Sequence, residues 1–202
     1  MNYLAVDTSA EYLTVVACKN GKETVYFEKD CAMRHSERLM GAIEETLSKA
    51  ELSPKDCDFF CAVTGPGSFT GIRIGISTIK GFCSALEKPA FAVTSFRTLA
   101  YNAIDKTLSV IPAGRGYFYV CGFDEKGEEI LAPEYASSDR LAELAEQFKL
   151  RSFADLPVPF ERADPAKGLC IAAAGFTGAT PLGALYVRKS QAEEEREKRE
   201  RQ

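Results

Sequence analysis

Short runs of apolar residues separated by turns fill the N-terminal part of the chain, a pattern typical of β-strands. Residues 2–9, 12–18 and 22–29 are rich in β-branched and aromatic residues, and Asn20-Gly21 between the last two runs is a strong hairpin signal. The first thirty residues therefore predict a meander of three antiparallel strands.

Two stretches further along have the periodicity of amphipathic helices. Apolar side chains recur at intervals of three and four residues over residues 36–50 and again over 70–86. Ser36 is suited to cap the first of these helices. The other elements expected in this half are strands over 58–64 and 89–94 and a helix over 95–104.

The order of predicted elements starts again after residue 105. Strands are expected over 108–112, 116–123 and 128–135, and Ser138 begins a helix, whereas residues 151–185 give no clear pattern. The repeated order predicts an α/β fold of two related subdomains, each a mixed sheet flanked by helices. The expected divisions are a first subdomain over 1–105, a smaller second subdomain over 106–188 and a charged tail over 189–202.

Composition narrows the classes of function. The 202 residues are 46% apolar and 27% charged, as in globular proteins, and the formal net charge is -4. An acidic chain repels phosphate backbones, so tight nucleic-acid binding by this chain alone is disfavoured. No basic leader opens the sequence and no apolar run approaches the roughly 18 residues that cross a bilayer. A cytoplasmic protein without membrane contact is therefore expected.

Seven cysteines and a single histidine bear on metal chemistry. The cysteines are scattered among apolar neighbours, as in Phe60-Cys61-Ala62, which is typical of buried thiols in a reducing compartment. Metal ligation would need a clustered Cys or Cys/His pattern, so no metal site is predicted.

Two turns at strand ends are candidates for phosphate binding. Asp7-Thr8-Ser9 offers a carboxylate and two hydroxyls, although the same residues also suit a turn that bonds its own backbone. GPGSFTG, from Gly65 to Gly71, leads from a strand into a helix whose first N–H groups suit an anion, but it lacks the Lys of a P-loop. The candidate nucleotide or phosphate residues are Asp7, Thr8, Ser9, Gly65, Gly67 and Ser68.

Glycines inside the helix expected over 70–86 need a physical reason. Gly71, Gly75 and Gly81 each cost about 1 kcal/mol relative to Ala in a helix interior. Close packing is the usual compensation, against either the rest of this chain or another protein.

Three blocks of the sequence resemble the bacterial TsaB (YeaZ) family. They are LAVDTS near the N-terminus, VTGPGSFTGIRIGISTIKGFCSAL over residues 63–86, and YVRKSQAE near the C-terminus. GPGSFTGIRIG is highly specific to that family, and the similarity is strongest over residues 1–105. The resemblance implies the fold of the actin-like and Hsp70-like ATPases, in agreement with the duplicated order of elements.

The resemblance also implies a role. Members of this family are the non-catalytic subunit of the machinery that installs threonylcarbamoyl on adenosine 37 of tRNAs reading codons that begin with A. The catalytic subunit, TsaD, is a paralogue of the same fold, and the ATPase TsaE joins the complex. On this basis the chain requires no cofactor of its own, ATP or ADP is expected only at the complex interface, and tRNA is reached through the complex.

Two positions depart from related patterns, and the first of these departures supports a non-catalytic role. The catalytic paralogue binds metal through a His-x-x-x-His pair, and Ser95 and Leu99 fall where those histidines would be. Ser is a weak ligand for a transition metal and Leu is none. The family's Asp-Ala-Arg stretch, which opens the second subdomain, is also altered, because Pro112 stands in place of the Asp.

The resemblance places the partner surface on the helices over 36–50 and 70–86. These helices are expected to pack against the same pair of TsaD or, in its absence, against a second copy of this chain as a homodimer. Arg34, His35 and Arg38 are expected at a polar rim, because a lone His beside arginines is more often an interface residue than a catalyst. The other expected contact residues are Leu39, Ile43, Phe69, Ile72, Arg73, Gly75 and Ile79.

The alternative is an independent enzyme. A nucleotide-dependent phosphotransferase or ATPase of the same fold would use Asp7, Thr8 and the GPGSFTG loop around Mg-ATP. ATP turnover by the isolated chain, lost on Asp7→Ala, would favour this interpretation. A metallopeptidase would need the two histidines that this chain lacks, and a scaffold that binds nucleotide without turning it over is compatible with the main prediction.

Overall fold

Two five-stranded sheets form the framework of the computed structural model, which describes residues 1–101 and 103–188. The predicted charged tail over 189–202 lies outside the described residues. The first sheet has the order β3-β2-β1-β4-β5. Its strands are β1 (Tyr3–Asp7), β2 (Leu13–Lys19), β3 (Lys22–Glu28), β4 (Phe59–Val63) and β5 (Ala90–Val93). β1, β2 and β3 pair antiparallel, as the hairpin signal predicts, whereas β4 and β5 continue the sheet in parallel.

The second sheet repeats this layout, with the order β10-β9-β6-β7-β8. Its strands are β6 (Thr107–Gly114), β7 (Tyr117–Phe123), β8 (Glu129–Ser137), β9 (Lys149–Ser152) and β10 (Glu161–Arg162). Again three strands pair antiparallel, and β9 and β10 add in parallel on the other side of the first of them. The predicted duplication of the strand order is confirmed.

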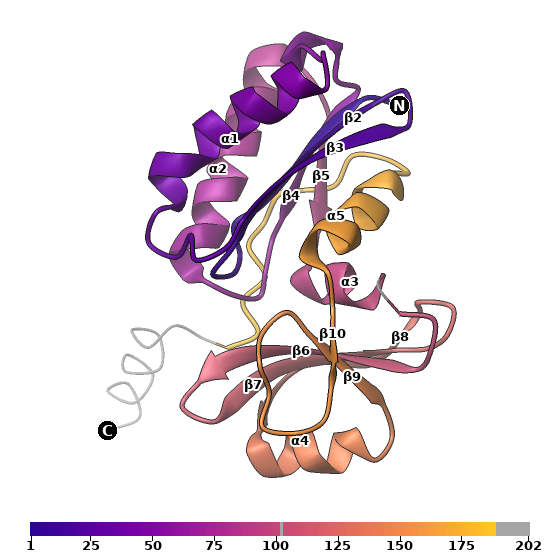
Figure 1. Ribbon diagram of the computed structural model, residues 1–202. Coiled ribbons are helices and arrows are strands. Elements are labelled where there is room, and N and C mark those ends of the chain that lie inside the picture. Colours follow the sequence, from indigo (N-terminus) through magenta and orange to yellow (C-terminus); the bar gives the residue numbers. More distant parts are fainter. Residues whose placement is uncertain (102, 189–202) are drawn as a thin grey trace, which may run out of the picture.

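Helices cover both faces of each sheet (Figure 1). On the first sheet, α1 (His35–Lys49) and α2 (Phe69–Leu86) lie on one face and α5 (Pro165–Ala174) on the other. On the second sheet, α4 (Ser138–Ala145) covers the outer face and α3 (Ser95–Ala100) lies between the two sheets. A short 3-10 turn, η1 (Pro54–Asp56), precedes β4.

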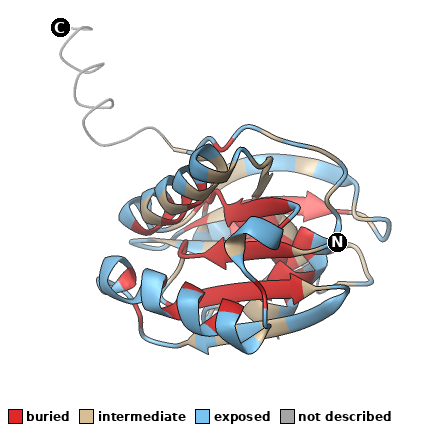
Figure 2. Ribbon diagram, turned by 90° about the horizontal axis from the view of Figure 1, so that it is seen from above, coloured by how far each residue is buried: buried red, intermediate tan, exposed pale blue. Residues whose placement is uncertain are grey.

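The strands β1 and β4 carry the largest core because they are buried on both faces. Every residue of both strands is buried, and their side chains point alternately to the α1/α2 side and to the α5 side. Continuous apolar runs are expected of central strands that helices cover on both sides. Figure 2 shows the consequence, with buried strands at the centre and helices exposed on their outer sides. Within the described residues, no helix combines the length and hydropathy that a bilayer span requires.

Three local predictions need correction. α1 begins at His35, so Arg34 and not Ser36 occupies the N-cap position, and Arg34 makes no side-chain cap bond. α3 ends at Ala100, four residues before the predicted end. The unassigned stretch over 151–185 contains the end of β9, then β10 and α5. Asp164 caps the start of α5 by accepting from two backbone N–H groups, and Pro165 lies in its first turn.

The segment after α5 has no regular structure but is bonded to both sheets. The backbone N–H of Thr180 donates to Ala90 O at 2.9 Å, and the N–H of Leu185 donates to Thr64 O at 2.8 Å. Leu182 is buried in the core beneath α1 and α2. Leu185 and Val187 then pack with Phe96 and Phe123 at the second sheet. This segment, residues 180–188, is called the C-terminal strap below.

Candidate functional site

The carboxylate of Asp7 lies at the end of β1 with no contact to solvent. Its Oδ1 accepts hydrogen bonds from the backbone N–H of Ser9 at 2.8 Å and from Ser9 Oγ at 2.6 Å. Its Oδ2 accepts one from the hydroxyl of Tyr12 at 3.1 Å. Both carboxylate oxygens are therefore bonded to groups of this chain.

The remaining predicted phosphate residues pack tightly against this turn. Thr8 Oγ1 donates to Gly71 O at 2.7 Å, and the N–H of Ser68 donates to Ser9 O at 2.7 Å. A Cβ at Gly67 would lie only 2.1 Å from Ser9 O, so the two loops are in backbone contact. Ser68 caps α2 through the N–H of Gly71. Gly65 is buried and accepts from the N–H of Ser95 at 2.8 Å.

The structure thus brings together all six predicted phosphate residues at one junction, in which the turn from Asp7 to Ser9 is closed to solvent whereas Ser68 is exposed. Asp7, Thr8 and Ser9 are 0%, 1% and 3% exposed, and their hydroxyls and carboxylate bond within the chain. The name junction is used below for Asp7, Thr8, Ser9, Gly67, Ser68 and Gly71. The groups that could hold a phosphate here already stabilise the meeting of β1 with the start of α2.

Burial dominates the electrostatics of the junction. Loss of hydration raises the pKa of Asp7, although the hydrogen bonds from Ser9 and Tyr12 oppose the shift. Burial also raises the pKa of Tyr12, with a further contribution from the neighbouring Asp7. The ring of Tyr12 meets the edge of Phe153, from the loop after β9, with centroids 5.5 Å apart. The spacing of residues gave no indication of this role for Tyr12, which lies five positions beyond Asp7.

Of Ser95 and Leu99, which fall where the catalytic paralogue would have its two histidines, Ser95 lies beside the junction. Ser95 Oγ donates to Ser9 Oγ at 3.1 Å, and Leu99 is fully buried. Pro112 pairs with Phe118 inside the β6–β7 hairpin, so it is a strand residue near the end of β6, the central strand of the second sheet. Among the residues that the structure describes, no group of three His, Cys, Asp or Glu side chains is arranged to hold a metal ion.

Several residues expected at the partner surface are instead buried within the chain, which corrects the prediction. The side chains of Leu39, Ile43, Ile72 and Ile79 are at most 2% exposed and pack against the first sheet. Gly75 is also buried, and a Cβ at this position would lie only 2.5 Å from Thr8 Oγ1. The apolar periodicity of these residues marks the side of each helix that faces its own sheet.

His35 is also buried, at 4% exposure, and does not lie on a polar rim. Its Nε2 lies 3.0 Å from the carbonyl oxygen of Tyr12. The histidine therefore ties the start of α1 to the hairpin that follows β1, and Arg34 and Arg38 on either side point to solvent.

The outer sides of α1 and α2 carry a different set of residues. Phe69 and Met40 are large apolar side chains about half exposed, at 48% and 54%. Of the 18 residues of α2, only Arg73 and Lys80 are charged. These outward residues are called the docking surface below, after the role that is proposed for them in the next subsection: Met40, Gly41, Phe69, Thr70, Arg73, Ile74, Ser77 and Gly81. A shallow hollow lies along α2 between Phe69, Thr70, Arg73, Ile74 and Ser77.

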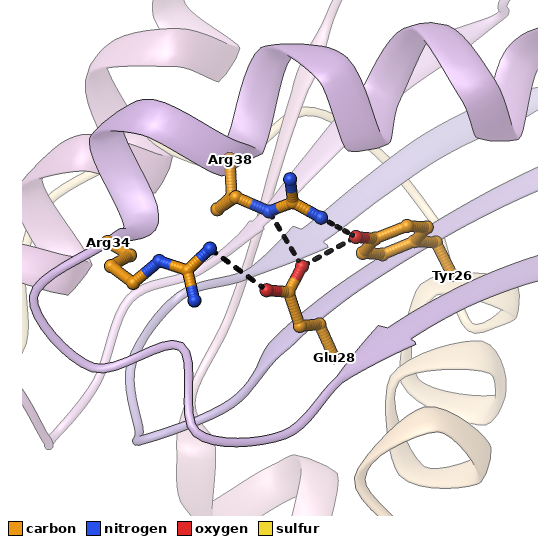
Figure 3. Close-up of polar contacts among 4 residues, drawn as sticks. All are labelled: Tyr26, Glu28, Arg34 and Arg38. Atoms are coloured by element: carbon orange, nitrogen blue, oxygen red, sulfur yellow. Dashed lines mark hydrogen bonds and ion pairs between the residues drawn. The ribbon is translucent and has the colours of Figure 1, made fainter.

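Two arginines form a polar cluster at the N-terminal end of α1 (Figure 3). Arg38 Nε donates to Glu28 at 3.0 Å and its guanidinium also donates to the hydroxyl of Tyr26 at 3.0 Å. Tyr26 in turn donates to Glu28 at 2.6 Å, and Arg34 lies 4.0 Å from the same carboxylate. The hydrogen bond from Tyr26, together with the two arginines, lowers the pKa of Glu28. The cluster fixes both arginines next to the exposed end of α1.

The repeated strand order and the helices between and around the two sheets define the actin-like and Hsp70-like class of α/β proteins. The structure of YeaZ from Pseudomonas aeruginosa has the same fold, with a TM-score of 0.77 at 24% identity, over 92% of this chain and 99% of that one. A family model described as "TsaD: tRNA N6-adenosine threonylcarbamoyltransferase" matches residues 29–178.

Two bacterial relatives identify the family of this chain more closely. Both carry the name tRNA threonylcarbamoyladenosine biosynthesis protein TsaB. The Escherichia coli protein is 31% identical over 66% of this chain and 64% of its own length, and the Bacillus subtilis protein is 30% identical over 79% and 70%. The chain therefore belongs to the TsaB (YeaZ) family, and it spans just under two thirds of the Escherichia coli relative.

Proposed function

We propose that this chain is a non-catalytic docking subunit of the machinery that installs threonylcarbamoyl on adenosine 37 of tRNAs reading codons that begin with A. It pairs with a catalytic subunit of the TsaD type, and the ATPase TsaE joins them. The names of the relatives support a role in threonylcarbamoyladenosine biosynthesis. In this proposal the chain needs no cofactor of its own, nucleotide binds only at the complex interface, and tRNA is reached only through the complex.

The observation that carries the proposal is the exposed side of α2. The solvent side of a surface helix is normally charged, yet here it presents Thr70, Ile74, Ser77 and Gly81. A Cβ at Gly81 would have no atom within 4 Å, and the same holds for Gly41 of α1. Nothing within the described chain therefore offsets the cost of these two helix-interior glycines. Close approach of a partner's helices would offset it, because small residues let helix axes come near one another.

The closed junction supports the absence of catalysis by this chain. An ATPase of this fold class would use the ends of β1 and β4 to hold phosphate and metal. Here Asp7, Ser9 and Tyr12 bond one another, and a bound phosphate would have to displace these contacts. In the absence of TsaD, the same docking surface would let two copies of the chain pair as a homodimer with two-fold symmetry.

Gly81→Arg tests the proposal. The position is open, so the variant should fold, and replacement of an exposed helix glycine should raise the free energy of unfolding by up to about 1 kcal/mol. The new side chain should nevertheless weaken binding to the TsaD-type subunit more than a hundredfold, measured by calorimetry or surface plasmon resonance, because it fills the space that the partner's helix would occupy.

Ile171→Arg is the matched control, since it places the same side chain on α5, on the opposite face of the first sheet, at a position 38% exposed. It should bind the partner as the unmodified chain does. Gly75→Arg is unsuitable for this purpose, because it would disturb the contact of α2 with Thr8. Unchanged affinity of Gly81→Arg would exclude α2 as the docking element.

A further inference from the structure

An aromatic and arginine cluster joins the C-terminal strap to the first turns of α2. The ring of Tyr186 stacks on that of Phe69, with centroids 5.4 Å apart and planes 30° from parallel. The guanidinium of Arg73 lies 3.8 Å from the centroid of Phe69, and its Nε donates to the hydroxyl of Tyr186 at 3.2 Å. Residues 113 positions apart in the sequence thus form one unit.

Despite these contacts, the cluster is open to solvent. Phe69 and Tyr186 are each 48% exposed, and Arg73 is exposed as well. The hollow along α2 begins at this cluster, since Phe69 and Arg73 line it together with Ile74 and Ser77. A half-exposed pair of aromatic rings beside an arginine has the composition of an interface hot spot.

The strap holds Tyr186 in place from both sides. On the side before it, the N–H of Leu185 bonds to Thr64 O at the end of β4. On the side after it, Arg188 donates to the hydroxyl of Tyr135 at 3.0 Å on the second sheet. Val187 packs among Phe96 and Phe123. Because its neighbours are fixed, Tyr186 would lose little conformational entropy on binding, which favours affinity.

We infer that Tyr186 is an anchor residue of the docking surface and contacts the partner subunit directly, so that the surface extends from α2 onto the C-terminal strap. This inference rests on the proposed function and adds a residue to it. The occupant is the TsaD-type subunit, and specifically a helix that lies along the hollow of α2. The hollow runs over successive turns of one helix, at Phe69, Arg73 and Ser77, which is the spacing that a second helix would follow.

Tyr186→Ala is expected to weaken binding of the TsaD-type subunit about thirtyfold, as truncation of a hot-spot tyrosine does. Tyr186→Phe keeps the ring and loses only the bond to Arg73, so its affinity should fall by no more than about fivefold. Tyr117→Ala is the matched control, because Tyr117 is 41% exposed and also stacks on another tyrosine, but on the second sheet. It should bind within about twofold of the unmodified chain.

Amide hydrogen exchange of the full chain shows whether Tyr186 contacts the partner directly or only holds the C-terminal strap in place. If the N–H of Leu185 stays protected in Tyr186→Ala while affinity falls, the ring acts through contact with the partner, as inferred. Full affinity of Tyr186→Ala would overturn the inference, and so would a loss of affinity that appears only together with loss of protection at Leu185. Failure of the proposed function is distinct, since it would appear as full binding by Gly81→Arg.

Discussion

The inner and outer sides of α2 both contain glycine, but the surroundings of these glycines differ. On the inner side, a Cβ at Gly71 would lie 2.0 Å from Thr8 O, and one at Gly75 would lie 2.5 Å from Thr8 Oγ1. On the outer side, a Cβ at Gly81 would meet nothing within 4 Å. The inner glycines are explained by the fold of this chain, whereas nothing in the described part of the chain explains the outer one. One helix therefore has a glycine side packed against the chain and a glycine side left open, which the proposed docking would use.

The largest change in the free energy of unfolding is expected for a substitution on the inner side of α2. Gly71→Ala should lower the free energy of unfolding by about 3 kcal/mol, because the added methyl group collides with the backbone of Thr8 and either α2 or the end of β1 must shift. Urea denaturation followed by circular dichroism measures the change. A loss below about 1 kcal/mol would show that the junction yields easily and is not the tightly packed contact described above.

Much of the fold could be predicted from the sequence because apolar alternation and turn signals are strong in the central elements. The hairpin at Asn20 and the long helices follow from local patterns. The stretch after residue 151 could not be assigned, because β10 is only two residues long and α5 is rich in small residues that carry no periodic signal. The start of α5 is nevertheless marked by Asp164 and Pro165.

The site was harder to predict than the fold, for two physical reasons. First, the resemblance points to two helices but not to one side of them, and Leu39 and Ile72 lie on the apolar side that is buried against the sheet. The outward glycines Gly41 and Gly81, which are unfavourable on an exposed helix surface, are the feature on which the proposed docking surface rests. Second, contacts such as that of Tyr186 with Phe69 join distant parts of the chain and leave no local pattern.

The second prediction concerns the buried carboxylate of the junction. Tyr12→Phe removes the hydroxyl that donates to Asp7 and should lower the free energy of unfolding by about 2 kcal/mol at pH 7, because a buried acceptor is left without its donor. The ring and its contact with Phe153 are kept, so packing is not the cause. Chemical denaturation at a series of pH values measures the effect.

The difference in stability between Tyr12→Phe and the unmodified chain should depend on pH through the pKa of Asp7. Burial raises the pKa of Asp7 above its value in the unfolded chain, so the folded protein binds the extra proton and is favoured at low pH. That stabilisation is fully present below the unfolded pKa of about 4 and is lost as the pH rises through the folded pKa. Loss of the Tyr12 donor raises the folded pKa further. The variant should therefore approach the unmodified chain in stability below the unfolded pKa and fall behind it as the pH rises through the folded pKa of Asp7, and a pH-independent difference would contradict the assigned bond.

The smallest effect is expected on the outer side of α2, and its sign is opposite to that of Gly71→Ala. Gly81→Ala should raise the free energy of unfolding by about 1 kcal/mol, because alanine restricts the unfolded chain and suits a helix interior, and the new methyl group meets no other atom. The same denaturation measurement applies, with Gly71→Ala beside it. A gain at Gly81 together with weaker binding of the partner would show that stability of the isolated chain has been given up for a close fit to another protein. A loss of stability at Gly81 would mean that the glycine serves the chain itself, and the contrast between the two sides of the helix would disappear.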